Sequence, residues 1–257
     1  MKRCASTLLR AAVLLGAAAA ARGAESAAQL VEAMRAARVS AGFEIRLTVR
    51  APGTGSPGGT TRLALIGQSD AEHDRLLVRA IAPAWLRDRA IVSERLGERI
   101  VATAFGPDAA AAPMPADPTA GLFGSGLVVW DLMAPWWNWP DQVAGPARAV
   151  AGHACTELRS RPDPHEAGVV REVVSCVDPR IGLAWLTLLF DDRHQLLRSI
   201  EVTRDMRTQG GAAAARSATI TDGDGGVTLV DVYGGDEQYQ IRPHTFDTAP
   251  AAPATRG

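Results

Sequence analysis

The sequence predicts a mostly β protein in which one N-terminal helix precedes an antiparallel sheet of about eleven strands. Three observations support this fold class. Residues 26–39 carry the pattern of a single helix. From residue 43 onward, apolar side chains recur at every second position, which is the period of a half-buried strand. Short turns separate most of the later strand candidates, and this favours antiparallel neighbours.

The helix has a recognisable start and stop. Ser26 and Gln29 have the spacing of a capping box, and Gly42 ends the segment. The first apolar positions of this helix are Leu30, Val31 and Met34.

The first strand has an apolar face formed by Phe43, Ile45, Leu47 and Val49. Further strands are expected at 60–68, 75–82, 90–95, 98–105, 147–160, 169–177, 183–190, 196–203, 216–221 and 227–233. Residues 106–118 show no periodicity and predict a loop. Strand 183–190 is apolar on both faces, so it predicts a mid-sheet position with cover on both sides. One of the two faces of this strand is expected to hold Leu183, Trp185 and Leu189.

The N-terminus predicts a signal peptide over residues 1–23. Lys2 and Arg3 precede the apolar run Ala11 to Ala21, which is too short to span a membrane. Cleavage is expected within 21–24. No later segment is a candidate membrane span, so the sequence predicts an exported protein that is not an integral membrane protein.

Residues 24–242 predict a single domain, and residues 243–257 predict a flexible tail. The whole chain has a formal net charge of -1, and loss of Lys2, Arg3, Arg10 and Arg22 with the signal leaves -5. A mildly acidic chain lacks the basic surface of a nucleic-acid binder. The 47% hydrophobic content excludes general disorder.

Cys155 and Cys176 predict a structural disulfide, because two cysteines in an exported chain are more often bonded than catalytic or metal-ligating. They lie on two strand candidates, 152–160 and 169–177. Pairing them directly opposite each other places the centre of the hairpin in the polar turn at 161–166. Opposed residues in that register lie within disulfide reach.

A Trp-rich segment, residues 121–140, holds four of the six tryptophans of the chain: Trp130, Trp136, Trp137 and Trp139. Ser125 can cap a short helix that Pro135 ends. Two interpretations follow. The segment is either a plug that packs against the sheet and fills the core, or a lid over an apolar cavity.

Several short motifs are similar to those of one family. They are Leu77-Val78-Arg79, Pro83-Ala84-Trp85-Leu86-Arg87, Leu122-Phe123-Gly124-Ser125 and Asp131-Leu132. Together with the pattern around Cys155 and Asp191–Arg198, they resemble the periplasmic outer-membrane lipoprotein-sorting protein family over most of residues 40–205. Gly126 stands where the family carries an aspartate, which identifies the chain as a diverged member.

The resemblance implies an incomplete antiparallel β-barrel of about eleven strands, with an N-terminal helix and a short helical, Trp-rich lid. It also implies a periplasmic carrier of lipoprotein acyl chains or other lipids. Such a cavity needs apolar walls, because an acyl chain gains about 0.8 kcal/mol per buried methylene. The lipid-binding residues expected on this basis are Phe43, Ile45, Leu47, Leu63, Leu65, Leu77, Trp85, Leu122, Phe123, Leu127, Trp130, Trp136, Trp137 and Trp185. The same faces would equally serve a dry core.

No catalytic, metal or cofactor site is expected. The five histidines lack zinc spacing, and no Gly-x-Ser-x-Gly elbow is present. The segment Asp222–Gly226 faintly resembles a calcium loop but is better explained as a hairpin turn.

Two functions follow. The first is a carrier that moves lipid toward the outer membrane, with an inner-membrane exporter and an outer-membrane acceptor as possible partners. The alternative is a periplasmic sensor or accessory subunit of a membrane exporter, which would use the same fold to bind a partner protein. Neither function requires catalysis.

Overall fold

The computed structural model describes residues 25–37, 42–51, 59–69, 73–106, 112–165 and 168–247. The signal peptide predicted for residues 1–23 lies outside these residues. The tail predicted for 243–257 is described only as far as residue 247, and within that part Phe246 is buried.

One helix, α1 (Ala27–Ala37), opens the described chain, as the capping pattern predicts. The Ser26 backbone N–H donates to Gln29 Oε1 at 2.8 Å, and the Gln29 N–H donates to Ser26 Oγ at 3.2 Å. The apolar side of α1 packs on the sheet through Leu30 and Met34, which are both fully buried. Gly182 allows the turn before β10 to pass close to α1, because a Cβ there would collide with the Ala33 carbonyl oxygen.

All strands of the described residues belong to one antiparallel sheet of thirteen strands, in the order β6-β5-β4-β3-β2-β1-β13-β12-β11-β10-β9-β8-β7. The first half of the chain supplies β1 (Phe43–Arg50), β2 (Thr60–Ser69), β3 (His73–Ala82), β4 (Ala90–Leu96), β5 (Arg99–Phe105) and β6 (Met114–Ala116). The second half supplies β7 (Asp141–Val150), β8 (His153–Arg161), β9 (Glu172–Asp178), β10 (Leu183–Phe190), β11 (Leu196–Arg207), β12 (Ala213–Asp222) and β13 (Val227–Asp236). Since the first and last strands in this order do not pair, the sheet is an open, incomplete barrel, which confirms the predicted fold class.

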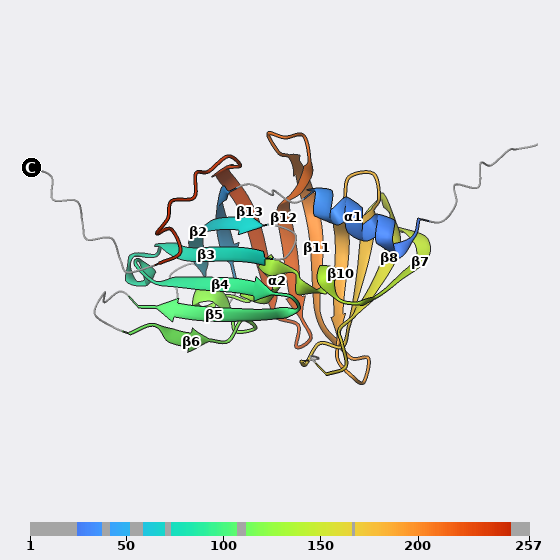
Figure 1. Cartoon of the computed structure of the whole chain (residues 1–257), viewed down its shortest axis with the longest axis horizontal. Helices are drawn as coiled ribbons and strands as arrows, with labels where there is room; N and C mark the ends of the chain where they lie inside the picture. Colours follow the sequence, from blue (N-terminus) through green and yellow to red (C-terminus); the bar gives the residue numbers. More distant parts are fainter. Residues whose placement is uncertain are drawn as a thin grey trace, which may run out of the picture.

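Figure 1 shows how strongly the sheet is curved. The strands β2 to β6 run in a different direction from β8 to β10, with α1 lying in front of the latter group and α2 between the two groups. We call the side of the sheet that faces α1 and α2 the inner face, and the opposite side the outer face.

Two strands exceed the predicted number. Residues 147–160, expected as one strand, are divided by a turn at Ala151 and Gly152, whose φ angles are 47° and 86°. Two successive positive φ values are typical of a tight hairpin turn, so β7 and β8 are separate strands. The other additional strand is β6, which lies in the segment expected to be a loop and pairs with β5.

The register of β1, β2 and β3 defines the inner face. Ile45 pairs with Leu65, and Leu65 pairs with Val78, so these three side chains lie on one side. Leu77 pairs with Ile66 and therefore lies on the outer face, where it contacts Phe246. Leu77 was expected to share the lipid-facing side, and the register places it on the other side.

The Trp-rich segment crosses the inner face as three short helical pieces. They are η2 (Leu122–Gly124), α2 (Val129–Met133) and η3 (Pro135–Asn138). Ser125 was expected to cap the helix, but its Oγ instead donates to the Leu122 carbonyl at 2.7 Å, and α2 starts without a side-chain cap. The Arg35 side chain ties α1 to this segment by donating to the carbonyl oxygen of Trp137 and to Asn138 Oδ1, both at 3.3 Å.

The Cys155–Cys176 disulfide is confirmed, with a Cα–Cα distance of 5.3 Å. The register is not the expected one, because Cys176 pairs with Glu157 and the two cysteines are diagonal neighbours. Trp185 packs on this disulfide and stacks on His153. A β-bulge between Ala184 and Leu186 breaks the alternation of β10, so Trp185 and Leu189 do not share a face as expected.

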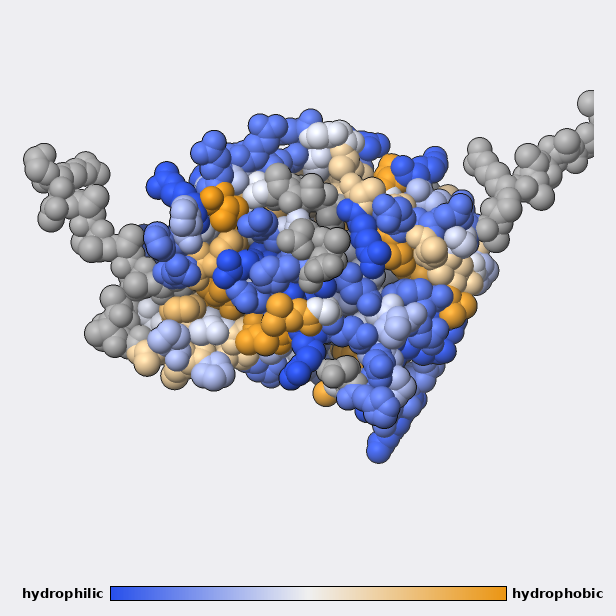
Figure 2. Space-filling view, viewed as in Figure 1, coloured by the Kyte–Doolittle hydropathy of each residue, from blue (hydrophilic) through white to orange (hydrophobic). Residues whose placement is uncertain are grey.

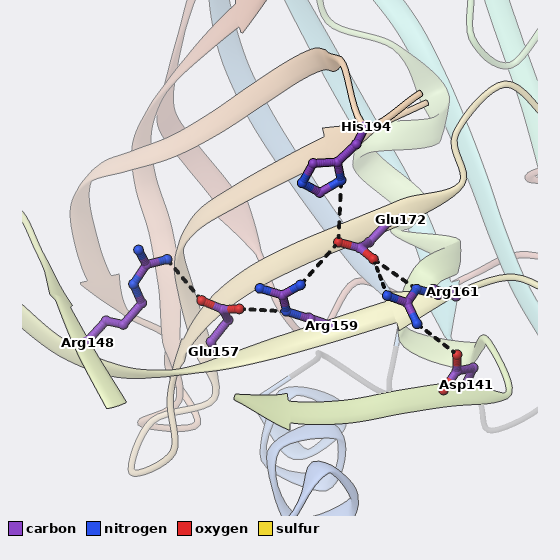
Figure 3. Close-up of polar contacts among 7 residues, drawn as sticks. All are labelled: Asp141, Arg148, Glu157, Arg159, Arg161, Glu172 and His194. Atoms are coloured by element: carbon purple, nitrogen blue, oxygen red, sulfur yellow. Dashed lines mark hydrogen bonds and ion pairs between the residues drawn. The ribbon is translucent and has the colours of Figure 1, made fainter. Parts of the chain in front are cut away.

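The outer face of β7, β8 and β9 carries a ladder of ion pairs (Figure 3). The buried carboxylate of Glu157 accepts from Arg148 at 2.9 Å and from Arg159 at 2.8 Å. The Glu172 carboxylate, also buried, accepts from Arg161 at 2.6 Å. These contacts join three neighbouring strands at the edge of the sheet.

The face of the molecule drawn in Figure 2 shows apolar residues gathered over the region of β3 to β5, while the tip near the β10–β11 turn is hydrophilic. Leu96 and Val101, from β4 and β5, are each 56% exposed. In the described part of the chain, no helix is long and apolar enough to cross a membrane.

Candidate functional site

Much of the inner face of β1, β2 and β3 is filled by the protein's own side chains. Leu47, Leu63 and Leu65 are 0–4% exposed and pack against the Trp-rich segment. That segment contributes Leu122, Phe123, Leu127, Val129 and Met133 to this cluster. Six of the expected lipid-binding residues, Leu47, Leu63, Leu65, Leu122, Phe123 and Leu127, therefore belong to a packed core.

A cavity of about 400 Å³ lies beside this core, between α1, the Trp-rich segment and the sheet. We call it the apolar cavity, because most of its wall is aliphatic or aromatic. Two expected site residues of β1, Phe43 and Ile45, line it, and so do Trp136 and Trp137. The other apolar side chains of the wall include Met34, Leu76, Leu132, Met133, Ile200, Val202, Met206 and Val232.

A second cavity, of about 640 Å³, lies on the other side of α2. We call it the mixed cavity, because aromatic, aliphatic and charged side chains share its wall. Trp130 and Trp139 supply the aromatic part, with ring centroids 5.9 Å apart. The charged residues of the wall are Glu98, Arg99, Asp131, Arg198 and Asp222.

Asp131 is the one side chain of α2 that lines both cavities. Its Oδ2 accepts from Arg198 Nη1 at 2.6 Å, and Arg198 also donates to Asp222 Oδ1 at 2.6 Å and to the Gly126 carbonyl at 2.7 Å. Its other oxygen, Oδ1, is buried and has no hydrogen-bond partner among the residues that the structure describes. Burial raises the pKa of Asp131 to about 7, although the Arg198 guanidinium beside it lowers the pKa.

A second buried carboxylate, that of Asp74, lines the apolar cavity at a different point. Its Oδ2 accepts from Arg95 Nε at 2.6 Å, and its Oδ1 accepts from the Ser69 hydroxyl. Arg95 also donates to the Gly97 carbonyl at 2.9 Å. Both oxygens of this carboxylate are thus satisfied by the protein.

The indoles of the Trp-rich segment form a close group above β9 and β10. Trp130 and Trp136 have ring centroids 4.9 Å apart. Trp136 is 3% exposed, and its Nε1 has no hydrogen-bond partner within the described residues. A buried indole N–H normally has a partner, so this donor is an exception that requires an explanation.

The expected site residues thus fall into five groups. Phe43, Ile45, Trp136 and Trp137 line the apolar cavity, and Trp130 lines the mixed cavity. Six belong to the packed core described above. Leu77 and Trp185 contact other clusters. Trp85, in η1 (Ala84–Leu86), is 55% exposed, whereas Leu86 beside it is buried in the core.

Sequence reasoning missed the contribution of α1 and of β11. Three alternate positions of β11 hold Arg198, Ile200 and Val202. Arg198 lines the mixed cavity, and Ile200 and Val202 line the apolar cavity. A signal was present, because an arginine that shares a strand face with two β-branched residues must find a buried partner. Among the described residues, no group of His, Cys, Asp and Glu could hold a metal ion.

Among known proteins, this chain is similar to solved structures only at the level of the fold. No known family profile matches the sequence, and no curated protein is similar to it. Solved structures do match. A DUF1329 family protein from Desulfovibrio piger has a TM-score of 0.75 at 14% identity, over 86% of this chain and 95% of that chain.

Two further solved structures match with similar scores. A putative outer membrane lipoprotein-sorting protein domain from Vibrio parahaemolyticus has a TM-score of 0.71 at 12% identity, over 86% of this chain and 97% of that chain. A LolA superfamily protein from Nitrosomonas europaea has a TM-score of 0.68 at 14% identity, over 87% of this chain and 98% of that chain. The chain has the lipoprotein-sorting fold. This confirms the resemblance inferred from the motifs, at the low identity expected for a diverged member.

Proposed function

We propose that the protein is a periplasmic carrier that holds an acyl chain of a lipoprotein or of another lipid in the apolar cavity and moves it toward the outer membrane. The observation that carries this proposal is the cavity of about 400 Å³ left between α1, the Trp-rich segment and the sheet. Its volume lies within the range of small-molecule sites, and its wall is mostly apolar with few polar groups.

The fold supports the proposal independently of the cavity. One solved structure with this fold is described as a putative outer membrane lipoprotein-sorting protein domain, and another as a LolA superfamily protein. The predicted signal peptide and the disulfide agree with an oxidising compartment such as the periplasm. Transfer of each methylene from water into the cavity contributes about 0.8 kcal/mol, which is sufficient for binding without any charged contact.

The first experiment is direct. The protein is purified under native conditions, and bound lipid is extracted and identified by mass spectrometry. Binding of an uncharged, lipid-mimicking fluorescent dye, N-phenylnaphthylamine, then gives an affinity for the cavity. Co-purified acyl lipid and saturable dye binding are expected.

A pair of matched variants locates the bound dye. Ile45→Trp adds an indole to the wall of the apolar cavity, and we expect it to weaken dye binding at least tenfold, because the added ring occupies the ligand volume. Val101→Trp makes a similar change at a position that is 56% exposed, and it should bind dye like the wild type. A lipid-free protein, or equal dye binding in Ile45→Trp and Val101→Trp, would overturn the proposal and favour a protein-binding role for this fold.

A further inference from the structure

Several buried polar side-chain atoms lie in the Trp-rich segment, and two of them are important for the apolar cavity. They are Trp136 Nε1 and Asp131 Oδ1, and neither has a hydrogen-bond partner among the described residues. Both side chains line the apolar cavity. An unsatisfied buried polar atom destabilises the folded protein, so two of them in one wall indicate a ligand that satisfies them.

We propose that the apolar cavity recognises the carbonyl group of an ester- or amide-linked acyl chain, through hydrogen bonds donated by Trp136 Nε1 and by Asp131. This inference rests on the proposed function, because it names the chemical group that an acyl ligand must carry. It distinguishes an acyl lipid from an alkyl chain that lacks a carbonyl.

The chemistry of the two groups selects an acceptor. An indole nitrogen can only donate, so its partner must be an oxygen with a free lone pair. The Asp131 carboxyl already accepts from Arg198 through Oδ2, and in its neutral form Oδ1 can carry the proton and donate it. A carbonyl oxygen has two lone pairs and can satisfy both donors or either one.

The surroundings of Asp131 also disfavour an ionised ligand headgroup at this point. The carboxylate of Asp222 faces Asp131 across Arg198, and its charge contributes to the raised pKa of Asp131. Asp74 lines the same apolar cavity. A carboxylate or phosphate placed here would have to compete with Asp131 and Asp222 for Arg198, whereas a neutral ester or amide would not.

The protonation of Asp131 should make this recognition depend on pH. Burial raises the pKa of Asp131 to about 7, so the carboxyl is neutral and can donate below that pH. Above it, the ionised group can only accept. The charged and titratable groups that share its two cavities are Arg198 and Asp222, together with Glu98, Arg99 and His165 on one side and Asp74 and Arg75 on the other.

The test compares two competitors that differ in one carbonyl. A monoacylglycerol and the monoalkylglycerol ether of the same chain length each displace N-phenylnaphthylamine from the wild-type protein. At pH 6 we expect the ester to bind about 3- to 10-fold more tightly than the ether, the range that one or two net hydrogen bonds provide. At pH 8 this preference should fall.

Three variants assign the preference to the two donors. Trp136→Phe removes the N–H and keeps an aromatic ring, so the preference for the ester should drop below about twofold. Trp139→Phe is the matched control, because Trp139 lines the mixed cavity only, and it should keep the wild-type preference. Asp131→Asn keeps a donor that does not titrate, so its preference should be the same at pH 6 and pH 8.

The outcomes separate this inference from the proposed function. Equal displacement by ester and ether in the wild type, or an unchanged preference in Trp136→Phe at both pH values, overturns the carbonyl site while acyl binding stands. If neither competitor displaces the dye, the proposed function itself fails. Thermal unfolding of each variant confirms that it is folded before its binding is compared.

Discussion

The two ends of the inner face are covered in different ways. Over β1 to β3, aliphatic side chains of the Trp-rich segment pack against the strands and leave Leu63 fully buried. Toward β10 to β12, and at the start of β1 around Phe43 and Ile45, α1 and the indoles span the sheet without filling the space, and a cavity of about 400 Å³ results. We call these the filled region and the hollow region. The strands differ as well, because alanines of β10 and β12 line the hollow region, whereas Leu47, Leu63 and Leu65 occupy the filled region. Both the covering segment and the size of the strand side chains therefore decide which part becomes core and which becomes cavity.

Two buried acids, Asp74 and Asp131, differ in how completely their carboxylate oxygens are hydrogen-bonded. Asp74 has both carboxylate oxygens hydrogen-bonded within the protein, whereas Asp131 has one oxygen bonded and one without a partner in the described chain. A fully satisfied carboxylate is typical of a structural site, and a half-satisfied one at a cavity is typical of a binding site. The predictions below test this distinction, beginning with the largest expected effect.

Loss of the buried ion pair between Arg95 and Asp74 should lower the free energy of unfolding more than any other change considered below. Arg95→Ala leaves the Asp74 carboxylate buried without its cation, and we expect the free energy of unfolding to fall by about 3–5 kcal/mol. Arg46→Ala removes an exposed partner of Glu44 and should cost less than about 1 kcal/mol. Urea unfolding of both variants measures the difference. Similar losses in the two would show that the buried pair has no special structural role.

Asp131, which has only one of its carboxylate oxygens hydrogen-bonded within the described chain, should make the free energy of unfolding depend on pH. Because the pKa of Asp131 is raised to about 7 in the folded protein, the native state keeps a proton that the unfolded chain releases above about pH 4. The contribution of this group is therefore fully present below pH 4 and is lost as the pH rises to 7, by up to about 4 kcal/mol. The Asp131→Asn variant lacks this titration. The difference between wild type and variant, measured by urea unfolding from pH 4 to pH 8, should follow that curve; a constant difference contradicts it.

Packing should distinguish the filled from the hollow region. Leu63→Ala creates a new void in the filled region, and we expect a loss of about 3 kcal/mol. Ile45→Ala enlarges a cavity that already exists, so its cost should be nearer to about 1 kcal/mol. In dye binding the order should be reversed. Ile45→Ala should have the larger effect and Leu63→Ala the smaller, because only Ile45 lines the cavity. Equal stability losses would show that the hollow region is as tightly packed as the filled one.

Local patterns predicted much of this architecture because local physics determines it. The capping box at Ser26 and the alternation from Phe43 to Val49 depend on nearby residues only, and both are present. The pairing of Cys155 with Cys176 was predictable from spacing and compartment, but its register was not, because a shift of two residues keeps both cysteines on one face.

Other features depend on contacts far apart in the chain. Leu77 lies on a strand that is apolar on both faces, and its register with Ile66 and the packing of Phe246 show which face it occupies. Trp185 is displaced by a β-bulge that no pattern announces. Whether Leu47 and Leu65 border core or cavity depends on where the Trp-rich segment lies, and the sequence of β1 and β2 carries no information on that.

Trp85 gives the smallest expected effect and the sharpest test of motif-based assignment. It was expected to bind lipid because it lies in a motif shared with lipoprotein-sorting proteins, but its side chain is 55% exposed and lines neither cavity. Trp85→Ala should change the free energy of unfolding by no more than about 0.5 kcal/mol and should leave dye affinity unchanged. Leu86→Ala, one residue further along η1, removes a side chain that is 2% exposed and should cost about 2–5 kcal/mol. A large loss of dye binding in Trp85→Ala would show that the ligand extends beyond the two cavities to this exposed turn.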